Sequence, residues 1–413
     1  MPIKKSALFT VFLVVLIDLI GFGIVLPLLP FYASQFHASP MAIGLLYSVY
    51  SFAQLIFSPI WGSFSDRIGR RPIMLMSTLG ASIAYLIFAF SHSLGILFFS
   101  RLLAGVMGGN ISTAQAYVAD VTTHQERTKG MGLIGAAFGI GFVLGPAIST
   151  FLIHPATHDL LANMGHSSLN QWVSANKYSV PGLFASLLSL TSFLLVLWKL
   201  PETVYQPAPA DSTSNFFSKS FWKALTEEGR SNGTHLLPLL LTSALLLSWG
   251  QANLYSSFPL FCQKILNLSA EHVGFQYIYM GLIAVFIQGG LIRVLTKKYP
   301  EEKLFLAGSI LVTAGMALIP FARSETTLTS FLMVMAVGGS LNGPTLNSII
   351  SKTADPSKIG AAMGTSQGMA ALGRVIGPTW GGVLYAVFFP LPFLLTALLV
   401  SSTIFIGFKL RKH

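Results

Sequence analysis

The chain has 413 residues, of which 53% are hydrophobic and only 9% are charged. A soluble domain carries roughly 25% charged residues, so this composition excludes an ordinary water-facing surface and indicates a lipid bilayer as the solvent. The formal net charge of +11 would suit a nucleic-acid partner, but the positions of the basic residues, described below, argue against one.

The chain turns apolar directly after its first few residues and stays so to about residue 33. A signal-peptide core is only about 7–15 residues long, so we expect this stretch to be retained as a membrane span. A spanning helix needs about 20 mostly apolar residues. Stretches of that kind recur at roughly 7–33, 42–62, 73–92, 95–119, 130–153, 180–200, 236–261, 272–294, 303–322, 328–350, 359–386 and 389–409. The pattern therefore predicts twelve transmembrane helices.

Most lysines and arginines lie in loops that share one side of the membrane with the N-terminus. Arg67, Arg70 and Arg71 follow the second span, and Lys297 and Lys298 follow the eighth. Because positively charged loops stay in the cytoplasm, we expect both termini there. The basic charge is then a topology signal, and no nucleic-acid partner is expected.

The chain also repeats internally. Gly145-Pro146 in the fifth span recurs as Gly377-Pro378 in the eleventh, 232 positions later. Transporters are commonly built from such repeats, with the substrate site between them near the membrane midplane. We expect an N-terminal half at 1–200, a polar cytoplasmic linker at 201–235 and a C-terminal half at 236–413. The predicted fold class is an all-α integral membrane protein with two pseudo-symmetric six-helix halves.

The loop after the second span reads Gly62-Ser-Phe-Ser-Asp66-Arg67-Ile-Gly69-Arg70-Arg71. It resembles the loop signature of the major facilitator superfamily. The resemblance implies that Arg70 reaches Asp120 at the inner end of the fourth span and that Asp66 faces the eleventh. It assigns a cytoplasmic gate to Asp66, Arg67, Arg70, Arg71 and Asp120. A plain positively charged loop is the alternative. The loop after the eighth span lacks the acid, so we expect only the first half to carry the full latch.

The glycines and prolines of spans five and eleven resemble the antiporter motif of the drug:proton exchangers. The resemblance assigns this motif to Gly141, Gly145, Pro146, Gly373, Arg374, Gly377 and Pro378. Small residues four apart also let helices approach closely, so ordinary packing is the alternative. Arg374 has two interpretations as well: it binds an anionic substrate group, or it caps backbone carbonyls of neighbouring helices.

Asp18 is the acidic residue that the predicted spans place deep in the hydrocarbon. Its surroundings, Asp18-Leu-Ile-Gly21-Phe-Gly23, resemble the tetracycline-efflux branch of the drug:proton antiporters. A charge at this depth costs about 2.5–3.5 kcal/mol on insertion scales, so the carboxylate needs a partner or a proton. We expect Arg101 in the fourth span to be the partner, and Asp18 with Arg101 to form the proton-coupling site. A permanent ion pair that orients the two spans is the alternative.

Polar and aromatic residues inside spans predict the substrate path. Amides and phenols among aromatic rings suit a small amphipathic organic molecule better than a bare ion or a sugar, although each could instead bond a neighbouring helix. The candidates are Tyr47, Tyr50, Gln54, Asn110, Gln115, Phe138, Phe142, Gln251, Asn253, Tyr255, Tyr277, Asn342 and Gln367.

These patterns favour a proton-coupled antiporter that exports such a molecule from a bacterial inner membrane, acting as a monomer. A proton-coupled or facilitative transporter of a metabolite, a siderophore or a lipid-like compound is the alternative. Gly364-Thr-Ser366-Gln-Gly368 matches a hydrolase nucleophile pattern, but it lies inside an expected span without a histidine, so we expect no enzyme. His154, His158, Asp159 and His166 form a weak metal-binding pattern in an outer loop. No metal or cofactor is expected.

Overall fold

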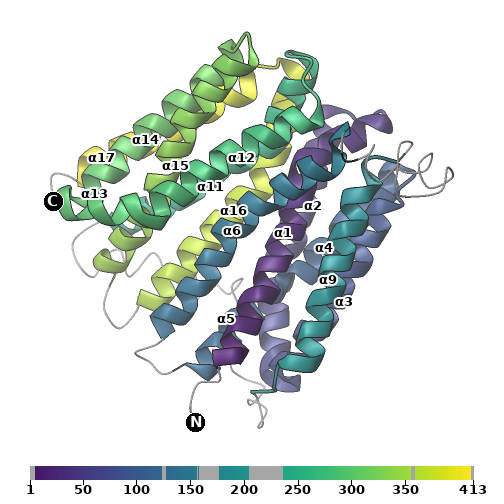
Figure 1. Ribbon diagram of the computed structural model, residues 1–413. Coiled ribbons are helices and arrows are strands. Elements are labelled where there is room, and N and C mark those ends of the chain that lie inside the picture. Colours follow the sequence, from purple (N-terminus) through teal and green to yellow (C-terminus); the bar gives the residue numbers. More distant parts are fainter. Residues whose placement is uncertain are drawn as a thin grey trace. The chain divides into compact units, whose positions relative to one another are not determined.

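The computed structural model of the chain describes residues 5–122, 127–155, 157, 176–203, 236–354 and 359–410. Within these residues the secondary structure is helical, and the helices form twelve long segments that match the expected spans (Figure 1). In the first half they are α1 (Lys5–Gln35), α2 (Pro40–Ile68), α3 (Arg70–Ala89), α4 (Leu94–Met107) with η1 (Gly108–Asn110) and α5 (Ile111–Val121), α6 (Arg127–Ile153) and α9 (Ser179–Lys199). In the second half they are α11 (Leu236–Lys264), α12 (Ala270–Phe286) with η2 (Ile287–Leu291) and α13 (Ile292–Lys298), α14 (Glu301–Leu318) with η3 (Ile319–Phe321), α15 (Glu325–Thr353), α16 (Ile359–Val387) and α17 (Leu391–Leu410).

Among the described residues, ten of these segments are long and apolar enough to cross a membrane. The other two, α15 and α16, have the length but carry more small and polar residues. Two predicted spans are not continuous α-helices. The fourth is interrupted by the 3-10 turn η1, and the eighth by the π turn η2. Both interruptions contain a pair of adjacent glycines, which lower the preference for a regular α-helix.

The chain divides into two compact units. Unit 1 comprises Met1–Ala38, Val49–Thr213 and Leu268–Ile278, and unit 2 comprises Ser39–Ser48, Ser214–Asn267 and Tyr279–His413. The first turns of α2 thus belong to unit 2, where Gly44 lies against the backbone of Pro378. The first turns of α12 belong to unit 1, where Gly274 lies against Thr150. Linker residues 204–235 lie outside the described part of the chain.

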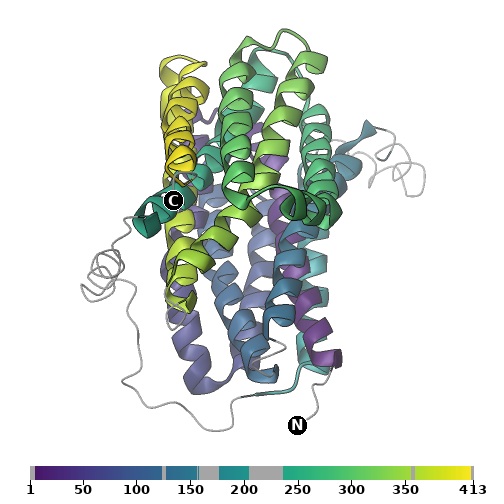
Figure 2. The same cartoon turned by 90° about the vertical axis from the view of Figure 1, so that its left-hand side faces the viewer.

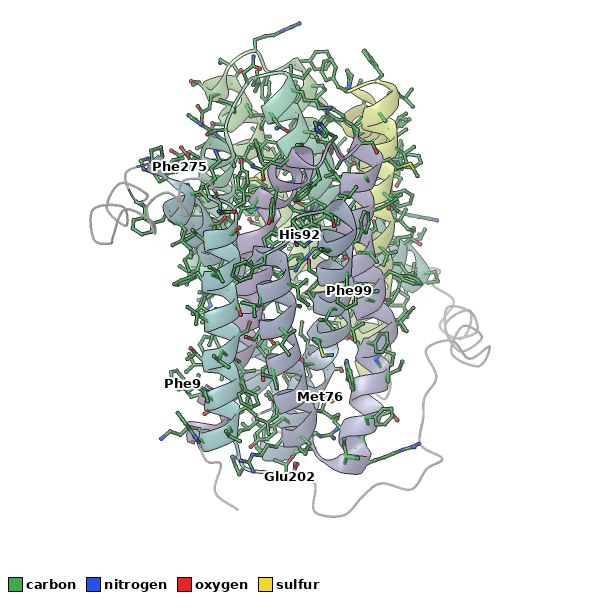
Figure 3. The ribbon with its side chains drawn as sticks, turned by 90° about the vertical axis from the view of Figure 1, so that its right-hand side faces the viewer. Phe9, Met76, His92, Phe99, Glu202 and Phe275 are labelled. Atoms are coloured by element: carbon green, nitrogen blue, oxygen red, sulfur yellow. The ribbon has the colours of Figure 1, made fainter. Side chains whose placement is uncertain are left out.

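In unit 1, α1 packs along α6 and α9, and α3 packs along α9. Glycine makes the contact between α1 and α6 close, because Gly141 lies against Leu19 and Gly145 lies against Gly23. Away from this core, apolar side chains point outward, as Phe9 of α1, Met76 of α3 and Phe99 of α4 do in Figure 3. Their exposed fractions of 59%, 44% and 55% suit a lipid-facing surface.

Unit 2 repeats this construction. Helix α11 packs along α16, while α14 packs along both α15 and α17 (Figure 2). Gly373 and Gly377 of α16 lie against the backbone of Trp249, as Gly141 and Gly145 lie against α1. The repeat extends to the chain turns: His37 after α1 and Asn267 after α11 both adopt a left-handed backbone, with φ of 55° and 53°. Close packing, the alternative explanation of the glycine motif, is therefore observed in both units.

These contacts predict how α6 responds to substitution. A Cβ atom added at Gly145 would lie 2.5 Å from the Gly23 Cα atom, whereas one at Gly139 meets no atom within 4 Å. Gly145→Ala should therefore destabilise the protein by about 1–3 kcal/mol through overpacking. Gly139→Ala should leave stability unchanged or raise it slightly through helix propensity. Thermal unfolding in detergent measures both, and equal melting temperatures for the two variants would contradict the observed packing.

Candidate functional site

Asp18 lies in the middle of α1, in unit 1. Its Oδ2 atom accepts a hydrogen bond from Asn110 Nδ2 at 2.5 Å. Its Oδ1 atom is shielded from solvent and has no hydrogen-bond partner among the described residues. A carboxylate with one bonded and one unbonded oxygen inside an apolar span is well placed to take up a proton.

Asn110 reaches Asp18 because the fourth span breaks at this level. Three side chains from α2 and α3 donate hydrogen bonds to consecutive carbonyls at the end of α4 and the start of the turn: Trp61 Nε1 to Val106 (2.6 Å), Ser77 Oγ to Met107, and Gln54 Nε2 to Gly108 (3.0 Å). These donors fix the 3-10 turn η1, whose last residue is Asn110. The turn aims the amide of Asn110 at α1.

Arg101 is placed differently from the expectation. In the described residues Asp18 has its hydrogen bond from Asn110, and the direct ion pair with Arg101 is not formed. The guanidinium carbon of Arg101 lies instead over three rings, 5.7 Å from the centroids of Tyr50 and Tyr85 and 5.4 Å from that of Phe88. Aromatic faces stabilise a buried cation without neutralising it. Tyr85 interacts electrostatically with both Arg101 and Asp18.

Tyr85 links α1 to this cation. Its hydroxyl oxygen would lie 2.8 Å from a Cβ atom at Gly21, one turn after Asp18. A side chain larger than hydrogen at position 21 would push Tyr85 away. The sequence analysis did not predict Tyr85. The available signal was Gly21 in the Asp18-Leu-Ile-Gly21 segment, because a glycine within a helix indicates a close neighbour.

An aromatic wall continues the site in unit 1. Phe22 of α1 stacks on Tyr50, with ring centroids 4.9 Å apart, and meets Phe142 of α6 edge-on at 5.8 Å. Phe138 stacks on Phe142 at 6.5 Å. The structure thus brings Tyr50, Gln54, Asn110, Phe138 and Phe142 together with Asp18 and Arg101. Gln115 does not join them, because it is exposed on α5.

The candidates of unit 2 are more scattered. Asn253 donates to the Pro392 carbonyl at 3.1 Å, and Asn342 donates to Ser309 Oγ at 3.5 Å. Both amides are buried and join neighbouring helices, so the bonding alternative explains them. Tyr47 and Tyr255 have ring centroids 6.0 Å apart. Gln251 and Gln367 are exposed and Arg374 is half-buried, as is Tyr277, which belongs to unit 1. For these four a place on the substrate path stays a prediction.

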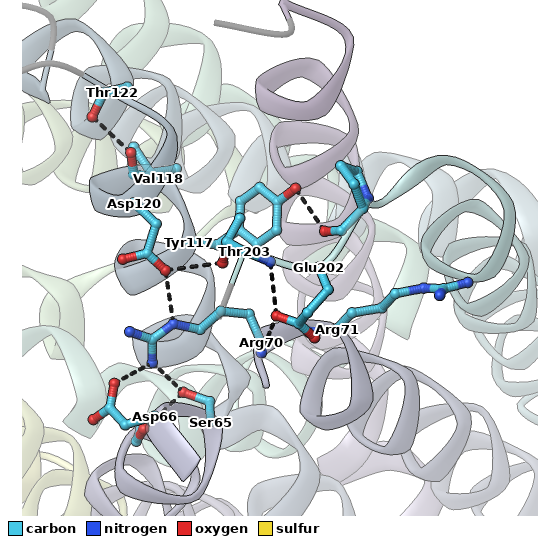
Figure 4. A network of polar contacts seen from close by, with 12 residues as sticks. Ser65, Asp66, Arg70, Arg71, Tyr117, Val118, Asp120, Thr122, Glu202 and Thr203 are labelled. Atoms are coloured by element: carbon cyan, nitrogen blue, oxygen red, sulfur yellow. Dashed lines mark hydrogen bonds and ion pairs between the residues drawn. The ribbon is translucent and has the colours of Figure 1, made fainter. Parts of the chain in front are cut away.

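A polar network ties the end of α2 to the ends of α5 and α9 (Figure 4). The expected contact between Arg70 and Asp120 is confirmed, with Nε 3.0 Å from Oδ2. Arg70 Nη1 also lies 2.6 Å from Asp66 Oδ1 and donates to Ser65 Oγ at 2.6 Å. Arg70 is buried, whereas Arg67 is exposed. The contact of Asp66 with the eleventh span stays a prediction.

Glu202 is a member of this network that sequence reasoning missed. Its Oε1 accepts from the backbone N–H groups of Arg70 (2.9 Å) and Thr203 (2.8 Å), and its Oε2 accepts from that of Arg71 (3.1 Å). Negative charge is favoured at a helix N-terminus, here the start of α3. Gly69 has a φ of 107° and would overlap Glu202 with any side chain.

Figure 3 places Glu202 at one end of unit 1, where α3 begins. Two further bonds close the network there. Thr203 Oγ1 donates to Asp120 Oδ2 at 3.0 Å, and Arg71 Nη2 donates to the Leu197 carbonyl at 2.6 Å. Arg70 and Glu202 therefore hold α2, α3, α5 and the end of α9 as one rigid group.

Unit 2 contains an ion pair at the matching place, with its charges exchanged. Glu301 at the start of α14 lies 2.8 Å from Lys352 near the end of α15, and Ser348 Oγ donates to Glu301 Oε1 at 2.9 Å. These two residues follow Arg70 and Asp120 by 231 and 232 positions. The loop after the eighth span still lacks an acid, so the expectation that only the first half carries the full latch stays a prediction.

Two weaker sequence patterns can also be placed. Gly364 to Gly368 lie within α16, and Ser366 is buried there, so the pattern lacks the strand–turn–helix setting of a hydrolase nucleophile. His158, Asp159 and His166 lie outside the described residues. In the part of the chain that the structure describes, no group of three or more histidine, cysteine, aspartate or glutamate side chains could hold a metal ion.

The network at the start of α3 predicts graded effects at position 202. Glu202→Ala removes the acceptor of three backbone N–H groups and should cost on the order of 2 kcal/mol, because bonds to charged groups are the stronger ones. Glu202→Gln keeps one acceptor oxygen and should cost less. Thermal unfolding of the two variants against the wild type measures this order. The same stability for all three proteins would mean that Glu202 does not hold the network.

The exchanged ion pair predicts a rescue. Glu301→Lys and Lys352→Glu each place like charges together, so each should lower the melting temperature. The double variant restores an ion pair and should recover part of the loss, with a coupling of about 1 kcal/mol because Lys352 is exposed. Additive losses in the double variant would show that the two side chains do not interact.

With this geometry established, the chain can be compared with known proteins. The family model described as "Major Facilitator Superfamily" matches residues 11–378 and 291–412. The tetracycline resistance protein, class B, of Escherichia coli is 29% identical over 380 residues, covering 90% of this chain and 86% of that protein. Multidrug resistance protein 1 of Bacillus subtilis (strain 168) is 26% identical over 417 residues, covering 99% of this chain and 98% of that one.

Solved structures show the same fold. The human organic anion transporter MFSD10 superposes with a TM-score of 0.65 at 24% identity, covering 98% of this chain and 100% of that one. A bacterial homologue of the human lysosomal transporter Spinster, in an inward-facing and occupied conformation, superposes with a TM-score of 0.76 at 12% identity, covering 100% of this chain and 97% of that one.

Proposed function

Because the chain belongs to the major facilitator superfamily, we propose that this multi-pass membrane protein is a proton-coupled antiporter that exports a small amphipathic organic molecule by alternating access. The observation that carries the proposal is the Asp18 carboxylate inside a membrane span. One of its oxygens is bonded to Asn110, and the other has no hydrogen-bond partner among the described residues. An ionisable group in such a position marks an ion pathway in membrane transporters.

The chemistry of coupling follows from the surroundings of Asp18. The ionised carboxylate is supported by the hydrogen bond that Asn110 donates. The protonated carboxyl is supported by the apolar span and the nearby aromatic wall. The two forms therefore need different surroundings, and a conformational change that alters these surroundings loads or releases a proton.

The direction and cargo of transport are supported by the relatives. Those compared above are named for resistance to tetracycline and to multiple drugs, which favours export over uptake of a metabolite. The aromatic wall of Phe22, Tyr50, Phe138 and Phe142 suits a flat, partly apolar molecule. Gly145-Pro146 and Gly377-Pro378, at the positions of the antiporter motif, agree with exchange.

We further propose that the protein lies in a bacterial inner membrane with both termini in the cytoplasm, where the basic loops place them. Halves 1–200 and 236–413, joined by the linker 201–235, are its moving parts. The network of Asp66, Arg70, Asp120 and Glu202 then forms the cytoplasmic gate of the first half. No enzymatic step is needed, because the proton gradient drives transport.

The test is transport by purified protein in liposomes under an imposed pH gradient. A panel of drugs that includes a tetracycline is added while an internal dye reports proton movement. Asp18→Asn keeps the size of the side chain but cannot ionise, so it should abolish drug-dependent proton movement. Glu302→Gln removes a carboxylate at the start of α14 and should leave coupling intact. Proton-driven transport that survives in Asp18→Asn would refute Asp18 as the coupling site.

A further inference from the structure

We propose that Asn110 is a positioning residue that bonds Asp18 in both of its protonation states by turning its side-chain amide over. The proposal rests on the proposed role of Asp18 as the proton site. It assigns to Asn110 a part in proton exchange, in addition to the place in the substrate cavity that its sequence context suggests.

The first step of the argument is the unused end of the amide. Asn110 Nδ2 donates to Asp18 Oδ2, which suits an ionised carboxylate because such a group only accepts. Asn110 Oδ1 is buried and has no hydrogen-bond partner among the described residues. A protonated Asp18 carries an O–H donor and needs an acceptor. Rotation about the last side-chain torsion of Asn110, which is broad and roughly two-fold, exchanges the two ends of the amide.

The second step is the rigidity of the backbone that carries Asn110. The backbone before Asn110 is held by three side-chain donors, those of Trp61, Ser77 and Gln54. They bond three consecutive carbonyls at the end of α4 and the start of η1. The turn cannot easily follow a change at Asp18, so the side chain of Asn110 must adapt. An amide is suited to this, because it both donates and accepts. An arginine or lysine at position 110 would bond only the ionised form.

The third step is the set of other groups that act on Asp18. Tyr50 comes from α2, Tyr85 from α3 and Arg101 from α4, and Tyr85 interacts electrostatically with the other two and with Asp18. Helix α6 contributes Phe138 and Phe142, which do not titrate. Helix α9 also packs on α1, and its sequence has no titratable side chain before Lys199. Of the described residues, Asn110 is the one hydrogen-bonded to the carboxylate.

The second half of the chain supplies a matched control. Asn342 lies 232 positions after Asn110, is also buried, and also has an Oδ1 atom without a hydrogen-bond partner in the described residues. Its Nδ2 atom faces Ser309, not a carboxylate. Asp18 itself corresponds to Ser248 of α11, because α1 and α11 match at an offset of 230, as His37 and Asn267 do. Asn342→Leu therefore removes an equivalent amide without touching the proton site.

The experiment compares Asn110→Leu, Asn342→Leu and the wild type in two measurements. In liposomes, Asn110→Leu should move the pH of half-maximal drug-dependent proton exchange upward by about one unit, the difference between a charge-assisted and a neutral hydrogen bond. Asn342→Leu should leave this pH unchanged. In detergent, Asn110→Leu should lower the melting temperature at pH values both above and below that midpoint, since the amide bonds both forms. Asn110→Ser, a smaller change, should shift the midpoint in the same direction.

The outcomes separate the two proposals. If Asp18→Asn abolishes proton coupling but both Asn110 variants leave the pH midpoint unchanged, the inference about Asn110 is wrong and the proposed function stands. If the stability loss of Asn110→Leu disappears below the midpoint, Asn110 is a donor to the ionised form alone and does not turn over. If Asp18→Asn still couples transport to protons, the proposed function itself fails.

Discussion

A carboxylate inside a membrane-spanning helix is the constraint on which the rest of this structure depends. The hydrocarbon of a bilayer offers no hydrogen-bond partners, so Asp18 must find them within the protein or hold a proton. Helix α1 alone cannot meet this need, because its backbone groups are already bonded to one another. The fourth span meets it by breaking at η1, and α2 and α3 supply the side chains that fix the break. The helix interruption is therefore part of the site.

The two halves of the chain share their glycine-mediated helix contacts but differ in their polar residues. Gly145 and Gly377 bring corresponding helices together in the same way. The polar groups diverge: Asp18 of α1 corresponds to Ser248 of α11, and the Arg70–Asp120 pair corresponds to Glu301–Lys352 with exchanged charges. A close helix contact requires one particular small residue, whereas an ion pair works equally well with its partners exchanged. One half can thus carry the proton site while both keep the same frame.

The sequence patterns predicted the long helices and the contact made by the gate loop. They did not predict the hydrogen-bond partners of Asp18 and Glu202. Twelve apolar stretches predict twelve long helices because length and apolar content decide membrane insertion. The link from Arg70 to Asp120 followed from a dense motif. The hydrogen-bond partner of Asp18 was not predicted. Opposite charge suggested Arg101, whereas the break at η1 brings Asn110 within hydrogen-bond distance. Glu202 was missed for a similar reason: it binds backbone N–H groups, which leave no side-chain pattern to read.

The central claim, that Asp18 exchanges a proton within the membrane, can be tested most directly by infrared difference spectroscopy of the purified protein during a pH titration. A protonated carboxyl has a carbonyl stretch that an ionised carboxylate lacks. We predict one such band that disappears as the pH rises, that is removed by adding transported drug, and that is absent in Asp18→Asn. A band that persists unchanged in Asp18→Asn, or no titrating band in the wild type, would contradict the account.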